Sequence, residues 1–399
     1  MKSRNKGTAE LLAPVGDMSR LKVALEYGAD AVYLSGKSLG MRAACKNFDY
    51  AELDAAVRET HARGKRVYVT LNIFPYDDDL KTVDEYLEYL DGICVDGVIV
   101  SDLGLIQRII KRTNIPVHVS TQANVLNADT AKVYADMGAK RIVLARELSL
   151  ERIKHIRDSL AGSVELECFV HGAMCISYSG RCLISAYLTG RSANRGECNQ
   201  ACRMRFTPEG YDEALEFVED DGTYIFGGND LNMIEHLGEL KAAGVSSFKI
   251  EGRVKSEYYV GCIVNAYRKA LSALESGKPI PLDIIAEPTK APNRGFNTGF
   301  YYGQPTASPT SAKYCDFCGI VTEFTPDGAV VEMRNRFKTG DSLEVLSFDD
   351  RYLNKRIIVP TMTDENGNAV DDAKVPTAKY TLRGIELPLL SMLRRPTSA

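Results

Sequence analysis

The sequence has few histidines, no long apolar run and no excess of positive charge. Only five of its 399 residues are histidine and no His-Glu-x-x-His motif occurs, which disfavours a metallopeptidase of that class. The apolar runs are no longer than β-strands, and the opening residues, MKSRNKGTAELLAPVGD, contain no apolar stretch of signal-peptide length. We therefore expect a cytoplasmic protein without a membrane partner. Because the formal net charge is −4, any contact with nucleic acid requires a local basic surface.

Cysteine, in contrast, is frequent. Four of the ten cysteines lie in one stretch, FVHGAMCISYSGRCLISAYLTGRSANRGECNQACR, at Cys175, Cys182, Cys198 and Cys202. Cytosolic thiol buffers keep cysteines reduced, so free thiols or metal ligands are favoured over disulfides. Four thiolates from one loop suit a tetrahedral zinc ion or an iron–sulfur cluster. The glycines of the stretch would let the loop wrap around the bulkier cluster, so the spacing modestly favours the cluster and leaves zinc as the alternative.

Short apolar runs alternate with segments of helical periodicity through the first two thirds of the chain. This alternation predicts parallel strands joined by crossover helices. Eight such runs favour an α/β fold, a (β/α)8 TIM-like barrel within residues 8–276, over an open doubly wound sheet with the same local pattern. The predicted strands cover residues 10–14, 31–35, 66–72, 97–102, 116–121, 141–146, 164–170 and 247–252.

Three further regions are predicted from length and composition. Residues 171–226 form a long cysteine-bearing insertion directly after the seventh strand, and a loop of this length indicates function. Residues 277–314, rich in Pro, Gly, Asn and Thr, are predicted to be a linker. Residues 315–397 contain short strands and turns, which predict a small C-terminal β-barrel domain.

The ends of the predicted barrel strands are polar, and in this barrel fold the chemistry takes place where the strands end. Helix capping explains any single one of these residues, but the two arginines among them are poor caps and favour a polar pocket. The residues at or just after strand ends are Asn72, Asp102, Ser120, Gln122, Asn124, Arg146, Glu147, His171, Glu251 and Arg253.

Several long motifs resemble the peptidase U-32 family of collagenase-like proteins. They are ELECFVHGAMCISYSGRCLISAYLTGRSANRGECNQACR, ELLAPVGDMSRLKVALEYGADAVYLS, STQANVLN and DLNMIEHLGELKAAGVSSFKIEGRVKSEYYV, and together they span nearly the whole chain. The resemblance implies a 4Fe-4S cluster held by Cys175, Cys182, Cys198 and Cys202, with prephenate as the source of a hydroxyl group. The C-terminal domain resembles that of the branch of the family that acts on tRNA.

The resemblance implies an oxygen-independent RNA hydroxylase that forms 5-hydroxyuridine at the tRNA wobble position, with an electron-transfer partner. Hydroxylation of ribosomal RNA or of a quinone precursor is a second possibility. A cysteine peptidase using Cys175 and His171 is an alternative, although four cysteines are more than one nucleophile needs. A non-enzymatic RNA-binding protein would leave the cysteines and the polar strand ends unexplained.

The polar and basic residues of the chain have distinct predicted roles. We expect His171, Glu251 and Gln122 to be catalytic. Arginine binds carboxylates bidentately, so Arg146, Arg253 and Arg181, together with Asn72, are expected to bind the dicarboxylate donor. Structural ion pairs of Arg146 with Glu147 and of Arg253 with Glu251 are the alternative. A phosphate-contacting surface is predicted at Arg203, Arg205, Arg334, Arg336 and Lys338, with Arg394 and Arg395, against the alternative of an ordinary charged surface.

The other cysteines are predicted to be packing residues. Cys45, Cys94, Cys168 and Cys262 lie in helical or strand patterns, where cysteine behaves as a small hydrophobic residue. Cys315 and Cys318 form a C-x-x-C pair without a second pair, which favours packing over metal binding.

Overall fold

The computed structural model describes residues 9–37, 39–41, 46–204, 228–305 and 314–397. The chain divides into two compact units. The first comprises residues 1–21, 30–254 and 294–310, and the second comprises residues 22–29, 255–293 and 311–399. Within the described residues, no helix is long and apolar enough to cross a membrane.

The first unit is a closed barrel of eight parallel strands, which confirms the predicted fold. Each strand pairs with the next, and the ring closes because β9 pairs with both β7 and β1. The alternative prediction of an open doubly wound sheet is therefore wrong. The barrel strands are β1 (Glu10–Pro14), β2 (Ala31–Leu34), β3 (Arg66–Leu71), β4 (Gly97–Val100), β5 (Val117–Val119), β6 (Arg141–Val143), β7 (Glu165–Ala173) and β9 (Ser247–Ile250).

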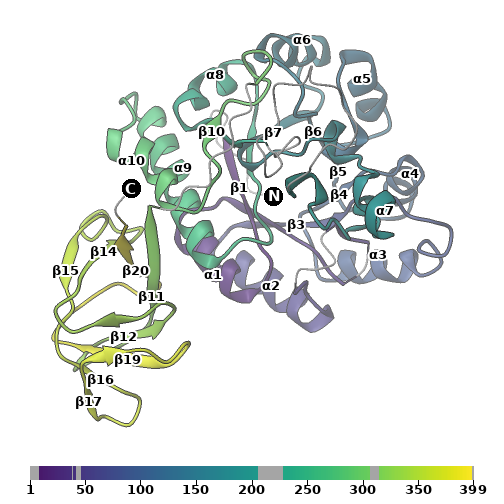
Figure 1. Ribbon diagram of the computed structural model, residues 1–399. Helices are drawn as coiled ribbons and strands as arrows, with labels where there is room; N and C mark the ends of the chain where they lie inside the picture. The colour runs from purple at the N-terminus through teal and green to yellow at the C-terminus, as the bar shows by residue number, and fades with distance from the viewer. Residues whose placement is uncertain (1–8, 38, 42–45, 205–227, 306–313, 398–399) are drawn as a thin grey trace, which may run out of the picture. The chain divides into compact units, whose positions relative to one another are not determined.

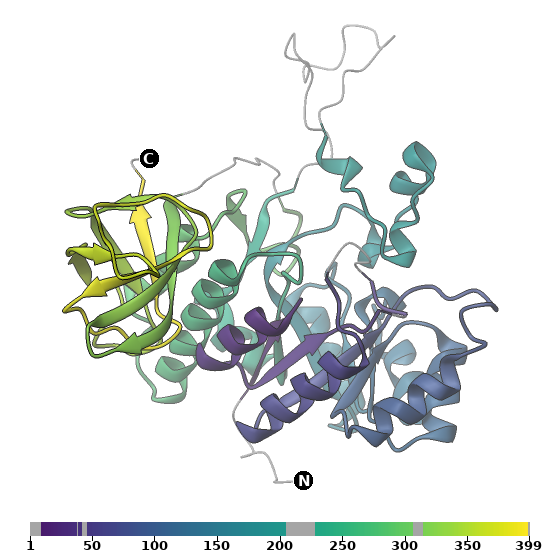
Figure 2. The ribbon, with the colours of Figure 1, turned by 90° about the horizontal axis from the view of Figure 1, so that it is seen from below.

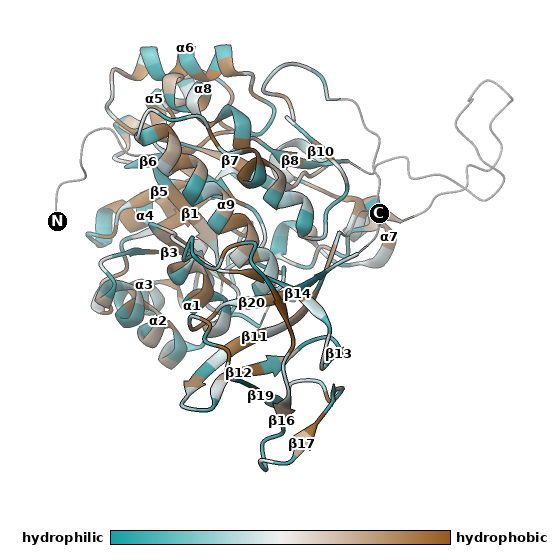
Figure 3. Cartoon of the chain, turned by 90° about the vertical axis from the view of Figure 1, so that its left-hand side faces the viewer, coloured by the Kyte–Doolittle hydropathy of each residue, from teal (hydrophilic) through white to brown (hydrophobic). Residues whose placement is uncertain are grey.

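Helices follow these strands, and α2 to α6 lie outside the ring of strands (Figure 1). Side-chain oxygens of Asp49, Asp102, Asn127 and Ser149 accept backbone N–H groups at the starts of α2, α4, α5 and α6, so Asp102 is a helix cap. The strands are mostly hydrophobic, whereas the helices alternate in hydropathy (Figure 3). The helices are α1 (Met18–Glu26), α2 (Tyr50–Ala62), α3 (Val83–Gly92), α4 (Leu103–Arg112), α5 (Ala128–Asp136), α6 (Leu150–Leu160), α8 (Leu237–Ala242) and α9 (Glu257–Glu275).

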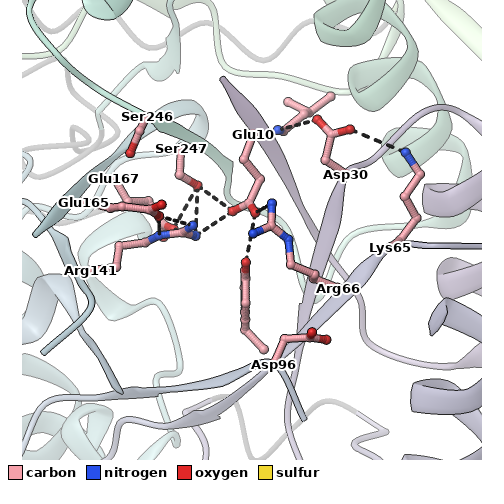
Figure 4. A network of polar contacts seen from close by, with 12 residues as sticks. Glu10, Asp30, Lys65, Arg66, Asp96, Arg141, Glu165, Glu167, Ser246 and Ser247 are labelled. Carbon is pink, nitrogen blue, oxygen red and sulfur yellow. Dashed lines mark hydrogen bonds and ion pairs between the residues drawn. The ribbon is translucent and has the colours of Figure 1, made fainter. Parts of the chain in front are cut away.

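A buried network of charges fills part of the barrel interior (Figure 4). Arg141, which is 1% exposed, pairs with Glu10 at 2.5 Å and with Glu167 at 3.0 Å. Glu10 also pairs with Arg66, and the Ser247 hydroxyl lies within hydrogen-bond distance of both carboxylates, 3.1 Å from that of Glu10 and 3.0 Å from that of Glu167. Each buried charge thus has an opposite partner, without which its burial would cost several kcal/mol.

Strand β7 runs past the barrel and supports an extension that the sequence did not predict. Its last residues, His171 to Ala173, pair antiparallel with β8 (Asp230–Asn232), and β8 pairs with β10 (Phe296–Asn297). Residues 277–314 were expected to be a linker, and the part up to residue 305 that the structure describes contains α10 (Leu282–Ala286) and the 3-10 turn η6 (Glu287–Lys290).

In the second unit, the predicted small β-barrel is a curled antiparallel sheet in the order β15-β14-β20-β11-β12-β19-β16-β17. Strands β13 and β18 form a separate pair. The bounds are β11 (Cys315–Thr325), β12 (Gly328–Met333), β13 (Phe337–Lys338), β14 (Ser342–Leu346), β15 (Arg356–Ile358), β16 (Met362–Thr363), β17 (Ala369–Val370), β18 (Asp372–Ala373), β19 (Lys379–Arg383) and β20 (Met392–Pro396).

Arg394, on β20, corrects one prediction. Its side chain is completely buried and pairs with Glu287 and Glu344. The prediction that Arg394 lines an RNA-contacting edge is therefore wrong, because its guanidinium is already enclosed by carboxylates.

Candidate active site at the barrel mouth and the cysteine loop

The cysteine loop, defined as residues 174–204, leaves the barrel where β7 ends. It contains η2 (Tyr178–Gly180), α7 (Ile184–Thr189), η3 (Ala193–Arg195) and η4 (Ala201–Arg203). Figure 2 shows this teal segment at one end of the barrel. Since all eight strands are parallel, this is the end at which the other barrel strands also finish.

All four cysteines lie on the cysteine loop, where Cys175 is exposed and Cys182, Cys198 and Cys202 are partly buried. Burial raises the pKa of the Cys202 thiol, Arg203 acts in the opposite direction, and negative charge on Cys175, Cys198 and Cys182 raises this pKa further. Thiolates held close together repel one another, and a bound cationic metal centre would relieve that repulsion.

The first attachment of the cysteine loop to the barrel is through Glu147. Its carboxylate accepts the backbone N–H of Ser179 at 2.6 Å and the Ser179 hydroxyl at 3.0 Å. The same hydroxyl lies 2.9 Å from Oδ1 of Asn124, which follows η1 (Thr121–Ala123) in a left-handed conformation. Glu147 is thus not the structural partner of Arg146 but the anchor of the loop.

A second attachment involves the segment after β3. Asn194 accepts the backbone N–H of Cys182 at 3.0 Å, and its carbonyl accepts the N–H of Phe74 at 3.0 Å. Arg195 forms a bidentate pair with Asp79, at 2.6 and 2.9 Å. These contacts fix the middle of the cysteine loop, so the cysteines lie on a segment that is hydrogen-bonded to the barrel.

Three predicted site residues meet beneath the loop. Asn72 donates to Oε1 of Gln122 at 2.8 Å, and Arg181 donates from Nε to the Gln122 carbonyl at 2.7 Å. Gln122 is 4% exposed, and its Nε2 has no hydrogen-bond partner among the described residues. Leaving a buried donor unpaired costs about 1–3 kcal/mol, so this amide is placed to donate to a further acceptor at the barrel mouth.

Arg146 and Glu251 lie together at the mouth. Their closest nitrogen and oxygen are 4.0 Å apart, and Arg146 donates to the carbonyl of Ala173 at 2.8 Å. The guanidinium lies 3.8 Å from the centre of the Phe169 ring, a cation–π contact that fixes its plane. The Tyr33 hydroxyl, which donates to the carbonyl of Ile250 at 2.9 Å, also lies 3.4 Å from the Glu251 carboxylate. The fixed guanidinium of Arg146 can bind an anion, and the neighbouring carboxylate of Glu251 can exchange a proton.

Sequence reasoning missed Lys249, which lies inside the barrel two residues before Glu251. Its ammonium group donates to Glu167 at 2.9 Å and lies 4.4 Å from the Tyr33 ring. Burial lowers the pKa of Lys249, while Glu167 and Glu251 raise it. The signal was present in the sequence, since a lysine in the middle of an apolar strand is rarely buried without a partner.

Arg253 is largely committed to local structure. One terminal nitrogen donates to the carbonyl of Met41 at 2.8 Å and lies 3.3 Å from Thr70, and the other donates to Asn47 at 2.6 Å. The arginine is 4% exposed. It therefore holds the segment after β2 and contrasts with Arg146, which donates one hydrogen bond, to the carbonyl of Ala173.

His171 lies within β7, is 1% exposed and contacts the Phe296 ring at 5.4 Å between ring centres. Cys175, four residues later, is exposed. A catalytic role for His171 stays a prediction, and a dyad with Cys175 would have to join a buried imidazole to an exposed thiol.

The predicted RNA contacts fall in several environments. Arg203 is half-buried next to Cys202 and donates to Gln200, and Arg205 lies outside the described residues. Arg334 pairs with Glu257 at 2.6 Å, and Arg336 with Asp372 at 2.5 Å. Lys338 is exposed. Their contacts with RNA stay predictions, with Arg334 and Arg336 partly neutralised by carboxylates.

The remaining cysteines mostly pack as expected. Cys168, Cys262, Cys315 and Cys318 are buried, which confirms their assignment to the cores. Cys94 is exposed, so its prediction as a core residue is wrong, because the chain turns there with a positive φ of 60°. Cys45 lies outside the described residues.

The donor set of the cysteine loop fits a sulfur-ligated cluster. Cys175, Cys182, Cys198 and Cys202 supply four thiols from one segment, the ligand number of a 4Fe-4S centre. Within the described ranges, no three His, Cys, Asp or Glu side chains are yet grouped closely enough to hold a metal ion. The sulfurs would therefore have to draw together around any single ion.

Comparison with known proteins supports one family. Residues 16–311 match the model of peptidase family U32, and residues 313–394 match that of the peptidase family U32 C-terminal domain. The tRNA hydroxylation protein P1 of Bacillus subtilis is 35% identical over 382 residues, which cover 92% of this chain and 90% of that protein. The tRNA hydroxylation protein P of Helicobacter pylori is 41% identical over 355 residues, covering 85% and 83%. A 23S rRNA 5-hydroxycytidine synthase of Escherichia coli is 40% identical over 267 residues, covering 66% and 39%. The matches extend over both units, and the chain belongs to peptidase family U32.

Proposed function

We propose that this protein is an iron–sulfur-dependent, oxygen-independent RNA hydroxylase that acts on the wobble uridine of tRNA, with prephenate as hydroxyl donor. The similar proteins named for tRNA hydroxylation and for 5-hydroxycytidine synthesis support an RNA-hydroxylating enzyme. The observation that carries the proposal is the cysteine loop, which bears four free thiols and is bound to the barrel mouth through Glu147 and Gln122.

The residues at the mouth have complementary roles in this proposal. Cys175, Cys182, Cys198 and Cys202 hold the cluster, which when bound supplies redox or Lewis-acid chemistry. Arg146 binds a carboxylate of the donor with its fixed guanidinium. Glu251, 4.0 Å away, accepts or returns a proton. The free amide hydrogens of Gln122 donate to a substrate oxygen, and Asn72 orients them through its 2.8 Å hydrogen bond. An external electron-transfer protein would interact near the exposed loop.

Metal analysis of anaerobically prepared protein tests the cluster. We expect a brown protein with about four irons and four sulfides per chain. Cys198→Ser should bleach it, whereas the matched control Cys94→Ser, an exposed cysteine outside the loop, should not. A colourless protein with stoichiometric zinc would contradict the cluster assignment.

Nucleoside analysis tests the reaction. Deleting the gene in its host should remove 5-hydroxyuridine-derived nucleosides from tRNA, and restoring the wild-type gene, but not the Cys198→Ser form, should return them. The peptidase alternative predicts instead that purified protein cleaves gelatin and that Cys175→Ser abolishes the cleavage.

A further inference from the structure

A groove of about 400 Å³ lies between α5 and α6. Lys132 of α5 and Arg152 and His155 of α6 line it, and all three side chains are exposed. Asp129 is its only acidic lining residue, while Leu126 and Ile156 contribute apolar surface. The groove is thus a basic surface on a protein whose net charge is −4.

The cations of the groove differ from those of neighbouring helices. On α4, Arg108 and Arg112 share the carboxylate of Asp84, at 2.7 and 2.5 Å. Neither Lys132 nor Arg152 has an ion-pair partner within the described part of the chain. Cations that line one groove repel each other, and an anion bound in the groove would reduce that repulsion.

The groove begins beside the cysteine loop. Leu126 lies two residues after Asn124, which is hydrogen-bonded to Ser179 of the loop at 2.9 Å. Two residues span at most about 7 Å. Helices α5 and α6 both start at the strand-end side of the barrel, so the groove opens near the same mouth as Arg146 and Glu251.

The chemistry of the lining suits phosphate. Arginine presents a planar fork that matches two phosphate oxygens, lysine adds a point charge, and imidazole can donate one further hydrogen bond. All three groups remain exposed at the rim, whereas small ligands are usually enclosed on most sides. An extended anion that stays largely in solvent, such as a nucleic-acid backbone, therefore fits better than a sequestered metabolite.

We propose that the groove between α5 and α6 binds phosphodiester groups of the RNA whose target nucleotide lies at the barrel mouth. This inference rests on the proposed function and extends it with a backbone-contacting site. Lys132 and Arg152 make the main contacts, His155 assists, and Asp129 limits the affinity.

Salt-dependent binding of an unmodified tRNA transcript tests the groove. The variant pair Lys132→Ala/Arg152→Ala should weaken binding about tenfold near physiological salt and reduce the slope of log affinity against log salt by about one to two. The control pair Lys140→Ala/Lys154→Ala removes two exposed cations outside the groove and should leave the slope near that of the wild type. Asp129→Asn should strengthen binding, which a merely structural role would not produce.

The outcomes separate the groove from the proposed function. If the wild-type protein binds no tRNA, the proposed function and the groove's role both fail. If it binds and the groove pair behaves like the control pair, only the groove's role is overturned. If the Lys132→Ala/Arg152→Ala variant no longer binds inorganic phosphate at millimolar concentration but keeps its tRNA affinity, the groove is a small-anion site instead.

Discussion

Glu147 binds Ser179 through two hydrogen bonds, at 2.6 Å from the backbone N–H and at 3.0 Å from the hydroxyl. Glu147 follows the sixth strand and Ser179 follows the seventh, so one carboxylate couples two neighbouring strand-end segments. Hydrogen bonds to a charged group contribute about 1.5–3 kcal/mol, enough to decide whether the cysteine loop stays attached.

Glu147→Ala should therefore loosen the cysteine loop without unfolding the barrel. We expect at least tenfold faster limited proteolysis within residues 174–204 and a lower iron content, with a nearly unchanged melting temperature of the barrel. Glu151→Ala, an exposed acidic residue four positions later, is the control. Equal proteolysis rates in the two variants would show that Glu147 does not anchor the loop.

Arg146 and Arg253 should respond differently to lysine. Arg146→Lys keeps the charge but loses the planar stack on Phe169, so turnover should fall at least tenfold and the KM for the donor should rise, while iron content stays normal. Arg253→Lys breaks the contacts with Met41 and Asn47 and should mainly lower stability, by about 2 kcal/mol. Steady-state kinetics and urea unfolding of both variants separate the two roles, and an unchanged KM for Arg146→Lys would shift the donor site toward Arg181.

Much of the barrel could be predicted from sequence because the strands are apolar runs that alternate with helices, and several of them follow a glycine turn. The run at residues 31–35, for example, is nearly identical to β2 (Ala31–Leu34). Local patterns carry this information, since strand length and hydrophobicity are properties of consecutive residues. Strands β8 and β10 were missed because each is only two or three residues long and is stabilised by pairing with distant segments.

The site was predicted less completely, because its contacts join residues far apart in the sequence. The polar strand ends did indicate Gln122, Arg146 and Glu251, but nothing local shows that Gln122 lies beneath Arg181. Arg394 illustrates the opposite error: a charged residue near the chain end looks exposed, yet distant carboxylates bury it. Burial of paired charges depends on tertiary neighbours that a linear pattern does not contain.

His118 should make the barrel sensitive to mild acid. Burial, together with the positive charges of Arg141, Lys249 and Arg66, holds the pKa of His118 well below its ordinary value of 6.5. Below pH 6.5 the unfolded chain binds a proton at His118, whereas the folded barrel keeps this side chain neutral. The stability present above pH 6.5 is therefore lost as the pH falls. The free energy of unfolding should decrease by up to about 1.4 kcal/mol per pH unit below that value.

Urea unfolding between pH 5 and pH 8 measures this effect. His118→Gln should flatten the dependence below pH 6.5, although it also loses the ring contact with Tyr68, whose centre is 4.5 Å away. His155→Gln, at an exposed site, should leave the wild-type dependence intact. A wild-type protein equally stable at pH 5.5 and pH 7 would show that His118 is not held neutral.

The pair Lys249 and Glu167 should be coupled strongly. Lys249→Met removes the ammonium that Glu167 binds at 2.9 Å and leaves that buried carboxylate with Arg141 and Ser247 alone. Removing one partner of a buried pair typically costs 3–5 kcal/mol, so we expect a loss of about 3 kcal/mol in the free energy of unfolding.

Glu167→Gln alone should also destabilise, because it leaves the buried ammonium without its carboxylate. The double variant Lys249→Met/Glu167→Gln has neither unmatched charge and should be at least 1 kcal/mol more stable than the sum of the single effects predicts. Additive losses would mean that water inside the barrel screens the two charges from each other. In that case Glu167 does not hold the Lys249 ammonium in place.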